Sequence, residues 1–422
     1  MIRVANISFR LATLVSRFLF MFFLAKMMAP VQIANYGIFT VSIGYALYFV
    51  GLDFHAYVTR EILRSDADQR GRMLKGQVAL STAVYILIFP LSFVFFKSQG
   101  WEIHMIIWYF PILVLELLNQ EISRILVVLS EQLMASALTF VRQGIWPILV
   151  VLIMQYEERA RELDTVMALW MLAGITAAFV GVWKLSSLNI SGWYLPIDWK
   201  WVRKGVSISV AFLLATMALR GLQTFDRYAI ENLDDVDLLA AYVVLIGIAN
   251  TLPLFLDAGV FAFSYPALIT LHHENKRGAA RKQVGIMLFQ TIAVCAIFAV
   301  VSIFALPHLL DWIENPVYMN ASHLYPWILA AIVLNGMGMV PHYALYSMRK
   351  DKPIIFSQVA GLVLFLSYLL FNTGSFSVNT IIGGLILSYS VIAVWKAMAY
   401  LLVIRYDIHS EKQSGTSESR VF

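Results

Sequence analysis

Residues 220–242 read RGLQTFDRYAIENLDDVDLLAAY, and the charges along this stretch decide how the rest of the chain is interpreted. An apolar segment ends here while it still carries Arg220, Asp226 and Arg227. An acidic turn follows, and a second apolar segment begins near Tyr242. Charged groups at the edge of a hydrophobic span are expensive unless they are paired or functional. These residues are therefore the first candidates for a functional site.

A similar arrangement occurs near the N-terminus, where a span that carries Arg17 is followed by a short turn and a span led by Tyr36. Arg17 precedes Tyr36 by 19 residues, and Arg220 precedes Tyr242 by 22. A basic loop follows the second span in both cases. The recurrence predicts two copies of one unit, although a regular array of helices could also produce it by chance.

The composition identifies the class of protein. Of the 422 residues, 60% are hydrophobic and only 14% are charged, whereas soluble domains carry about 25% charged residues. The chain is therefore expected to be an integral membrane protein. Its formal net charge is +5, but the Lys and Arg residues lie in short loops between apolar runs. The positive-inside bias explains that distribution better than nucleic-acid binding does.

About 20 apolar residues are needed to cross a bilayer. The first apolar run has no clear small-residue cleavage site, which favours a retained helix over a signal peptide. On these criteria the sequence predicts twelve spans: 11–28, 36–58, 76–96, 105–129, 133–154, 166–184, 205–225, 239–265, 284–306, 324–348, 353–371 and 378–404.

Orientation follows from the basic residues. With a cytoplasmic N-terminus, 22 of the 31 Lys and Arg residues lie on the cytoplasmic side, 4 lie on the opposite side and 5 lie in or at the ends of spans. This bias predicts that both termini are cytoplasmic. The polar C-terminal tail is rich in Ser, Glu and Lys, which is typical of disorder.

Six spans per half is an even number, so both halves enter the membrane from the same side. The predicted fold is therefore all-α, with two six-helix bundles related by a pseudo-two-fold axis along the membrane normal and a cleft between them. The expected boundaries are 1–190 for the first bundle, 191–406 for the second and 407–422 for a disordered cytoplasmic tail.

Two arginines stand out by depth. Arg17 lies near the middle of its span and cannot easily reach either interface, whereas Arg10 and Lys26 can extend to opposite interfaces. Arg220 lies in the outer half of its span. An intramembrane arginine normally faces a water-filled cavity or a carboxylate partner. Arg17 and Arg220 are therefore expected to line a substrate path.

The other charged residues have a competing structural interpretation. Glu116, Gln120 and Arg124 form a polar stripe that either seals against a neighbouring helix, through a Glu116–Arg124 network, or lines the lumen. Arg142 is another mid-depth cation, with Glu116 as its plausible partner. For Asp226 and Arg227, the structural interpretation is a helix-end ion pair. Asp257 and Asp53 are two separate candidate sites for a proton or a cation.

Absent motifs limit the chemistry. No GxxxxGK[ST], HExxH or GxSxG pattern occurs, so P-loop ATP hydrolysis and these hydrolase mechanisms are not expected. The single cysteine, Cys295, excludes an intramolecular disulfide and a cysteine-based zinc site. The sequence predicts a protein that is not an enzyme and that has neither a cofactor nor a catalytic or metal site.

The segment RFLFMFFLAKMMAPVQIANYGIFTVSIGYALYFVGLDFHAYVTREIL combines a basic residue, a short Pro-containing turn, a Tyr-Gly and a later Thr-Arg. Together with DRYAIENLDDVDLLAAYVV, it resembles the polysaccharide-transporter branch of the multidrug/oligosaccharidyl-lipid/polysaccharide exporter (MOP) superfamily. That branch includes the O-antigen repeat-unit (Wzx-type) flippases. Gly51-Leu52-Asp53 departs from the more apolar stretch expected there.

The resemblance implies a flippase for undecaprenyl-diphosphate-linked oligosaccharides in the bacterial inner membrane, serving O-antigen or capsule assembly. It implies membrane lipids, a glycan polymerase and chain-length regulators as partners. The expected diphosphate-binding residues are Arg17, Arg220, Arg142 and Arg227, and the expected coupling or ion-pair residues are Glu116, Asp257, Asp226 and Arg124.

Two alternatives remain. The first is an ion-coupled exporter of small molecules or drugs in the same superfamily, for which an acidic and aromatic site is expected. The second is a non-transporting scaffold of a glycan assembly complex, which would need no charges in a cavity.

Overall fold

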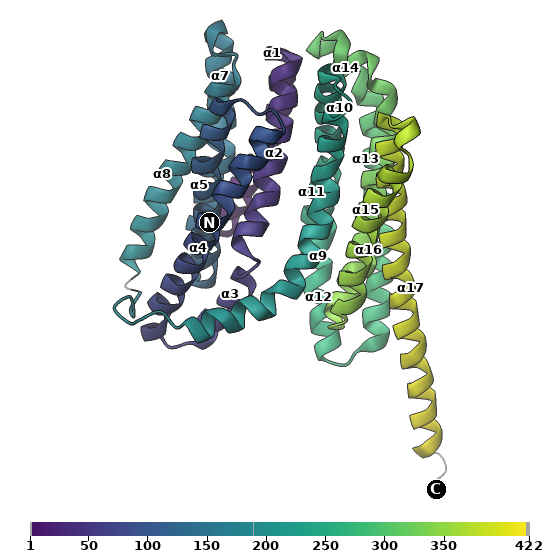
Figure 1. Cartoon of the computed structure of the whole chain (residues 1–422). Helices are drawn as coiled ribbons and strands as arrows, with labels where there is room; N and C mark the ends of the chain where they lie inside the picture. The colour runs from purple at the N-terminus through teal and green to yellow at the C-terminus, as the bar shows by residue number, and fades with distance from the viewer. Residues whose placement is uncertain (1, 189, 419–422) are drawn as a thin grey trace. The chain divides into compact units, whose positions relative to one another are not determined.

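The computed structural model describes residues 2–188 and 190–418, which form helices and no strand (Figure 1). Within these ranges eleven helices are long and apolar enough to cross a membrane, and the bent helix α9 (Trp199–Glu231) brings the number to twelve. The structure confirms the predicted all-α fold, and the chain is a multi-pass membrane protein.

Two compact units emerge from the contacts along the chain, and each is described by itself. Unit 1 comprises Met1–Tyr228, Asp235–Val244 and Trp312–Tyr318, and unit 2 comprises Ala229–Asp234, Leu245–Asp311 and Met319–Phe422. Most of α9 belongs to unit 1, although the sequence assigns it to the second bundle. The bundle boundary at residues 190 and 191 stays a prediction.

The elements that contribute to unit 1 run in chain order from the N-terminus. They are α1 (Ile2–Met27), α2 (Pro30–Gly51), α3 (His55–Arg64), α4 (Ala67–Ser98), α5 (Ile103–Val128), α6 (Gln132–Phe140), η1 (Val141–Ile145), α7 (Trp146–Tyr156), η2 (Glu158–Ala160), α8 (Leu163–Ser187), most of α9, and the first part of α10 (Val236–Ala249).

Unit 2 contains the later elements. They are α11 (Thr251–Leu256), η3 (Asp257–Phe261), α12 (Ala262–His273), most of α13 (Arg277–Ile313), the end of α14 (Pro316–Asn320), η4 (Ser322–Leu324), α15 (Tyr325–Ser347), α16 (Asp351–Phe371), η5 (Thr373–Ser375) and α17 (Val378–Glu418).

Residues 220–242 fold with a shorter turn than expected. α9 continues to Glu231 because residues 226–231 contain no Gly or Pro that would end a helix. Asp226 and Arg227 therefore lie inside α9 and not at its end. The acidic run then starts α10, since the Asp235 carboxylate accepts a hydrogen bond from the Leu238 amide at 2.9 Å.

The predicted second span, 36–58, is divided in the structure. α2 ends at Gly51, and Leu52 and Asp53 follow with φ values of +51° and +49°. These left-handed residues redirect the chain into α3, a short helix with one apolar face. That face belongs to a core cluster formed by Phe54, Tyr57, Val58, Ile62, Leu74 and Val202.

Among the described residues, two spans contain a π-helical turn. η1 interrupts the helix between α6 and α7, and η3 interrupts the long span Val236–His273. Insertions of this kind are frequent at functional sites. Each of these two turns carries a charged residue that the sequence singles out, Arg142 in η1 and Asp257 in η3.

The C-terminal tail differs from expectation. The sequence predicts disorder for 407–422, but α17 extends to Glu418. No proline follows Val378 to interrupt its hydrogen-bond ladder. Residues 419–422 lie outside the described residues.

α2 approaches α10 closely within unit 1. A Cβ added at Gly37 would lie 2.2 Å from Cγ2 of Val243, whereas a Cβ at Gly44 would meet no atom within 4 Å. Overpacking of this kind costs about 1–3 kcal/mol. We therefore expect Gly37→Ala to lower the melting temperature of the purified protein.

Gly44→Ala on the same helix is the matched control and should be neutral or stabilising, since Ala favours a helix by up to about 1 kcal/mol over Gly. Adding Val243→Ala to Gly37→Ala should restore stability. Equal melting temperatures for the two glycine variants would contradict the close packing of α2 against Val243.

Candidate functional site

Charged side chains within the spans fall into two groups in the structure. Arg124, Arg142 and Arg227 form ion pairs with carboxylates. Arg17 and Arg220 hydrogen-bond only to neutral side chains within the described chain. The sequence separates Arg17 and Arg220 by their depth. It also assigns Arg142 and Arg227 to diphosphate binding, because pairing depends on which helices become neighbours.

Arg17 is exposed on α1. One of its terminal nitrogens donates to the side-chain oxygen of Gln143 at 3.4 Å. No carboxylate in the described part of the protein lies within ion-pair distance of Arg17. Its charge is therefore not neutralised by a neighbour.

Arg220 is exposed on α9 and contacts α2. It donates to Gln223 at 2.9 Å and to the Tyr48 hydroxyl at 2.8 Å. The centre of its guanidinium also lies 4.9 Å from the centroid of the Tyr48 ring, a cation–π distance. These contacts orient Arg220 without removing its charge. Arg17 and Arg220 both belong to unit 1, although the sequence assigns one to each half.

Glu116 and Arg142 form a buried ion pair between α5 and η1, with side chains 7% and 6% exposed. Glu116 also accepts a hydrogen bond from the Trp170 indole at 2.8 Å. The Trp170 ring stacks on Trp146 at 5.4 Å. The pairing that the sequence proposes for Glu116 and Arg142 is present, and it satisfies both charges inside the protein.

The π-turn η1 sets the directions of two neighbouring side chains. Arg142 points into the core of unit 1, and the next residue, Gln143, contacts Arg17. Gly144 permits the close packing there, because an added Cβ would lie 2.4 Å from the Phe140 ring. The Ser16 hydroxyl donates to the Gly144 carbonyl at 2.6 Å and fixes η1 against α1.

Asp226 and Arg227 form a second buried network. The Asp226 carboxylate receives the Arg227 guanidinium at 3.3 Å and the Tyr242 hydroxyl at 2.7 Å. Arg227 also donates to the Gln223 carbonyl at 2.6 Å. The network joins α9 to α10 across their turn, so the pair is an ion pair as the structural interpretation expects, but it lies inside α9 and not at the helix end.

One expected partner is wrong. Arg124 pairs with Glu121 at 2.5 Å and not with Glu116. Glu116 and Arg124 are eight residues apart, about 12 Å along a helix, whereas Glu121 lies on the adjacent turn. Glu121 also receives the Gln77 amide at 2.5 Å. Its spacing of three residues from Arg124 was the signal that could have identified it.

Unit 2 contains further charges within its spans. Asp257 is exposed in η3. Lys396 on α17 is 2% exposed, and the described residues give it no hydrogen bond or ion pair. Lys396 is one of the five basic residues that the sequence places in or at the ends of spans, but no role is predicted for it, although a lysine inside an apolar run is a signal of function. Among the described residues, no group of three or more His, Cys, Asp or Glu side chains could hold a metal ion.

The geometry separates neutralised cations from available ones. A guanidinium whose partners are amide and hydroxyl groups keeps its full charge and several N–H donors. Such a group can bind a phosphate or carboxylate in bidentate fashion. Arg17 and Arg220 therefore offer anion-binding capacity that Arg124, Arg142 and Arg227 have already used.

The sequence matches no protein-family profile. A search of curated proteins finds no relative in sequence. The comparisons with solved structures therefore carry the argument on fold.

An inward-facing multidrug resistance MATE family transporter of the MOP superfamily superposes with a TM-score of 0.77 at 10% identity, over 95% of this chain and 99% of that one. An outward-facing MATE family transporter of the MOP superfamily superposes with a TM-score of 0.58 at 12% sequence identity, over 95% of this chain and 94% of that one.

The third structure is a MOP superfamily transporter from Pyrococcus furiosus, whose binding pocket has reverse polarity. It superposes with a TM-score of 0.57 at 10% sequence identity, over 94% of this chain and 93% of that one. At such low sequence identities, the similarity to these structures shows the fold alone. The chain therefore has the fold of the MOP-superfamily transporters.

The Glu116–Arg142 pair generates a stability prediction. Replacing only Arg142 with Met leaves a buried carboxylate without its cation, which costs about 3–5 kcal/mol. Thermal unfolding of the purified protein should show a large loss of stability for Arg142→Met. The double variant with Glu116→Leu should recover most of it, because both charges are then gone. A double variant no more stable than Arg142→Met would show that the two residues are not coupled.

His55, the first residue of α3, generates a pH prediction. Burial, together with the positive charge of Arg124, lowers its pKa from 6.5 to about 4. The folded protein resists protonation of His55, whereas the unfolded chain protonates near pH 6.5. The contribution of neutral His55 to the free energy of unfolding is therefore complete above pH 6.5 and decreases as the pH falls towards 4. The decrease is about 2 kcal/mol between pH 6.5 and 5.

Melting temperatures of the wild type and His55→Gln, measured from pH 7.5 to 5, check this linkage. The wild type should lose more stability on acidification than His55→Gln. Parallel curves would mean that His55 titrates normally in the folded protein.

Proposed function

We propose that the protein is a flippase that moves undecaprenyl-diphosphate-linked oligosaccharide repeat units from the cytoplasmic to the outer face of a bacterial inner membrane. It would act by alternating access in O-antigen or capsule assembly. The observation that carries the proposal is the pair Arg17 and Arg220, two exposed span arginines whose partners in the described chain are neutral.

The physical argument begins with the substrate. A diphosphate and its sugars cannot enter hydrocarbon unaided, because moving an unpaired ion there costs tens of kcal/mol in the Born limit. Guanidinium groups lower this cost, since they stay charged and bind phosphate oxygens in bidentate fashion. Gln143, Gln223 and Tyr48 hold the two arginines without competing for their charge.

Within this proposal the arginines have two different roles. Arg17 and Arg220 bind the diphosphate, while the lipid tail remains in the bilayer. Arg142 is the sequence neighbour of Gln143, which contacts Arg17, and Arg227 shares α9 with Arg220. Their carboxylate partners Glu116 and Asp226 already neutralise them. Their role in this proposal is to hold helices that position the binding residues.

The membrane potential supplies a driving force. A cell interior negative by 100 mV favours outward movement of each negative charge by about 2.3 kcal/mol. A diphosphate with two charges would gain about 4 to 5 kcal/mol. Asp257 is the residue that could add proton coupling, because its carboxylate is exposed in the π-turn η3.

The structural comparisons support the transport part of the proposal. The similar solved structures include inward-facing and outward-facing transporters. The Pyrococcus furiosus transporter is described as having a pocket whose reverse polarity suggests a different function. The fold is therefore compatible with more than one polarity of substrate site. With cytoplasmic termini, the protein would work beside a glycan polymerase and chain-length regulators.

A second candidate is an ion-coupled exporter of small molecules or drugs, because similar structures include multidrug transporters. A site for organic cations should present carboxylates and aromatic rings. Arg17 and Arg220, the exposed residues that carry the flippase proposal, are cationic and would repel an organic cation. Resistance to organic cations on expression, without any change in surface glycan, would favour this candidate.

The flippase proposal predicts the effect of removing either arginine. Arg17→Gln and Arg220→Gln should each reduce export of surface glycan by about ten- to a hundredfold, since a hydrogen bond to a charged group contributes about 1.5–3 kcal/mol. Undecaprenyl-linked oligosaccharide should accumulate on the cytoplasmic face. Arg17→Lys should be intermediate, because it keeps the charge but loses the planar fork.

Lys97→Gln, at the end of α4, is the matched control that removes a positive charge elsewhere. All variants must be compared at equal levels in the membrane. Full export by the Arg17→Gln/Arg220→Gln double variant would refute the assigned role.

A further inference from the structure

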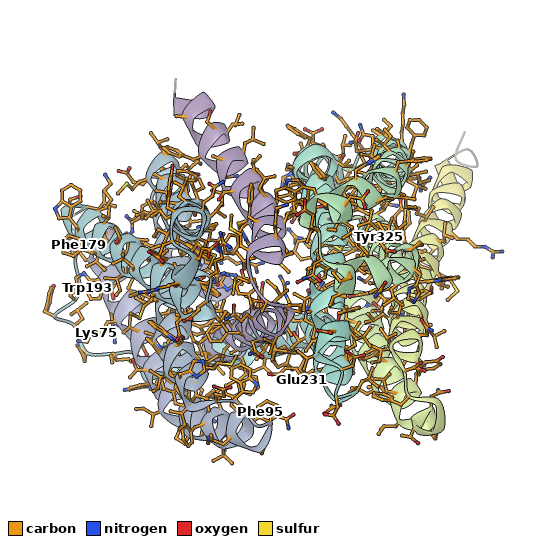
Figure 2. The ribbon with its side chains drawn as sticks, turned by 90° about the horizontal axis from the view of Figure 1, so that it is seen from above. Lys75, Phe95, Phe179, Trp193, Glu231 and Tyr325 are labelled. Carbon is orange, nitrogen blue, oxygen red and sulfur yellow. The ribbon has the colours of Figure 1, made fainter. Side chains whose placement is uncertain are left out.

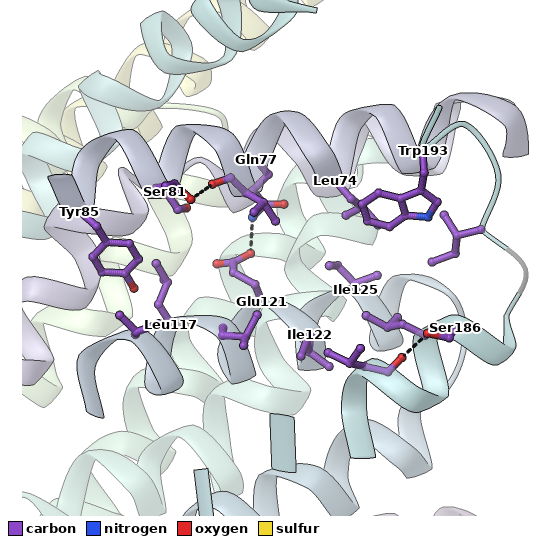
Figure 3. A pocket seen from close by; sticks show the side chains of 17 residues that line it. Leu74, Gln77, Ser81, Tyr85, Leu117, Glu121, Ile122, Ile125, Ser186 and Trp193 are labelled. Atoms are coloured by element: carbon purple, nitrogen blue, oxygen red, sulfur yellow. Dashed lines mark hydrogen bonds between the residues drawn. The ribbon is translucent and has the colours of Figure 1, made fainter. Parts of the chain in front are cut away.

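A groove of about 680 Å³ lies within unit 1 between α4, α5 and α8 (Figure 3). α4 contributes one face of its helix, from Leu74 to Tyr85, and α5 contributes Val114 to Ile125. The connection after α8 closes one end with Ile190 and Trp193. The volume falls in the range of specific small-molecule sites, about 300–1,000 Å³.

The groove opens on a flank that faces the bilayer. Val78 on α4 and Val182 on α8 line it, and they are 57% and 49% exposed. The neighbouring Phe179 is 75% exposed, and Figure 2 shows it on the same flank as Trp193 and Lys75. Only 6% of the most apolar window of α4 is buried. The protein alone therefore leaves most of α4 to be covered by lipid.

The polar side chains in the groove are directed at the protein itself. The Thr82 and Ser186 hydroxyls donate to carbonyls of their own helices, at Val78 and Val182, both at 2.9 Å. The Tyr85 hydroxyl reaches the Leu113 carbonyl at 3.5 Å.

Deeper in the groove, Gln77 donates to Glu121, whose other oxygen holds Arg124, and both distances are 2.5 Å. These side chains therefore have few hydrogen-bond donors or acceptors left for a ligand. An occupant of the groove is expected to be a hydrocarbon chain.

The length of the groove fits one leaflet. Leu74 and Tyr85 are eleven residues apart, which corresponds to about 16 Å along a helix. Half of a hydrocarbon core is about 15 Å. A single acyl chain that enters at the Trp193 end would reach the middle of the membrane at Tyr85.

The entrance carries an uncompensated positive charge. The Lys75 ammonium donates to the carbonyls of Trp193 at 3.2 Å and Leu195 at 3.0 Å. No carboxylate in the described chain lies within ion-pair distance of it. The neighbouring Arg72, in contrast, pairs with Asp198 at 3.5 Å. Lys75 therefore keeps one donor and its charge for an anion at the membrane surface.

We propose that this groove binds one acyl chain of an anionic phospholipid, with its phosphate at Lys75 and its chain along α4 towards Tyr85. The bound lipid fills the space that α4 and α8 leave over α5. Under the predicted orientation the site lies in the cytoplasmic leaflet. The proposal concerns a resident lipid and does not depend on what the protein transports.

Native mass spectrometry of the protein, purified from nanodiscs that contain equal amounts of phosphatidylglycerol and phosphatidylcholine, tests the proposal. The wild type should retain phosphatidylglycerol about tenfold more than phosphatidylcholine. Val78→Trp, which places a large ring at the exposed rim, should reduce the retained lipid about tenfold. Leu87→Trp is the matched control, because Leu87 is 66% exposed on α4 and does not line the groove.

The headgroup contact is tested separately. Lys75→Gln should retain lipid but lose the preference for phosphatidylglycerol, whereas Lys97→Gln should keep it. Equal retention by Val78→Trp and the wild type would overturn the proposal, because the lipid would then be merely annular. An unchanged preference in Lys75→Gln would overturn the assigned headgroup contact. Displacement of phosphatidylglycerol by undecaprenyl phosphate would also contradict the proposal, since the groove would then take the polyprenyl tail.

Discussion

The cost of a guanidinium group inside a bilayer is the constraint on which this structure depends. Such a group must be paired, hydrogen-bonded or in contact with water. Arg142 and Arg227 satisfy the requirement by carboxylates in the core of unit 1. Arg17 and Arg220 satisfy it with Gln143, Gln223 and Tyr48, which hold the side chain but leave its charge. The proposed function follows from this difference.

The paired residues also explain how the site is held in position. Glu116 links Arg142 and Trp170, so α5, η1 and α8 meet at one buried network. The π-turn η1 then directs Gln143 towards Arg17. In the same unit, Asp226 joins Arg227 to Tyr242 and fixes α9, which carries Arg220. Neutralised charges thus support the positions of available ones.

The sequence predicted the helical membrane fold because a bilayer imposes a length and composition on every span. It also identified Glu116 and Arg142 as partners, since few acids were available at that depth. It did not predict that Arg124 pairs with Glu121, although their spacing of three residues on one helix indicates that pair. The left-handed turn at Leu52 and Asp53 was also not predicted, since positive φ values are uncommon for such residues.

The groove could not be predicted from the sequence for a different reason. Periodicity reports which residues share one helix face, but a cavity depends on the separation of three helices. Thr82 and Ser186 look like polar lining in the sequence, yet both hydroxyls turn back to their own backbone. The chemical character of the groove is therefore a property of rotamers, which only the packed structure defines.

The most direct measurement of the central claim is a cryo-electron microscopy structure of the protein in nanodiscs with an undecaprenyl-diphosphate-linked sugar. The account predicts phosphate oxygens within hydrogen-bond distance of the guanidinium groups of Arg17 and Arg220, with the Glu116–Arg142 pair intact. A diphosphate bound elsewhere, with Arg17 and Arg220 still on their glutamine and tyrosine partners, would contradict it.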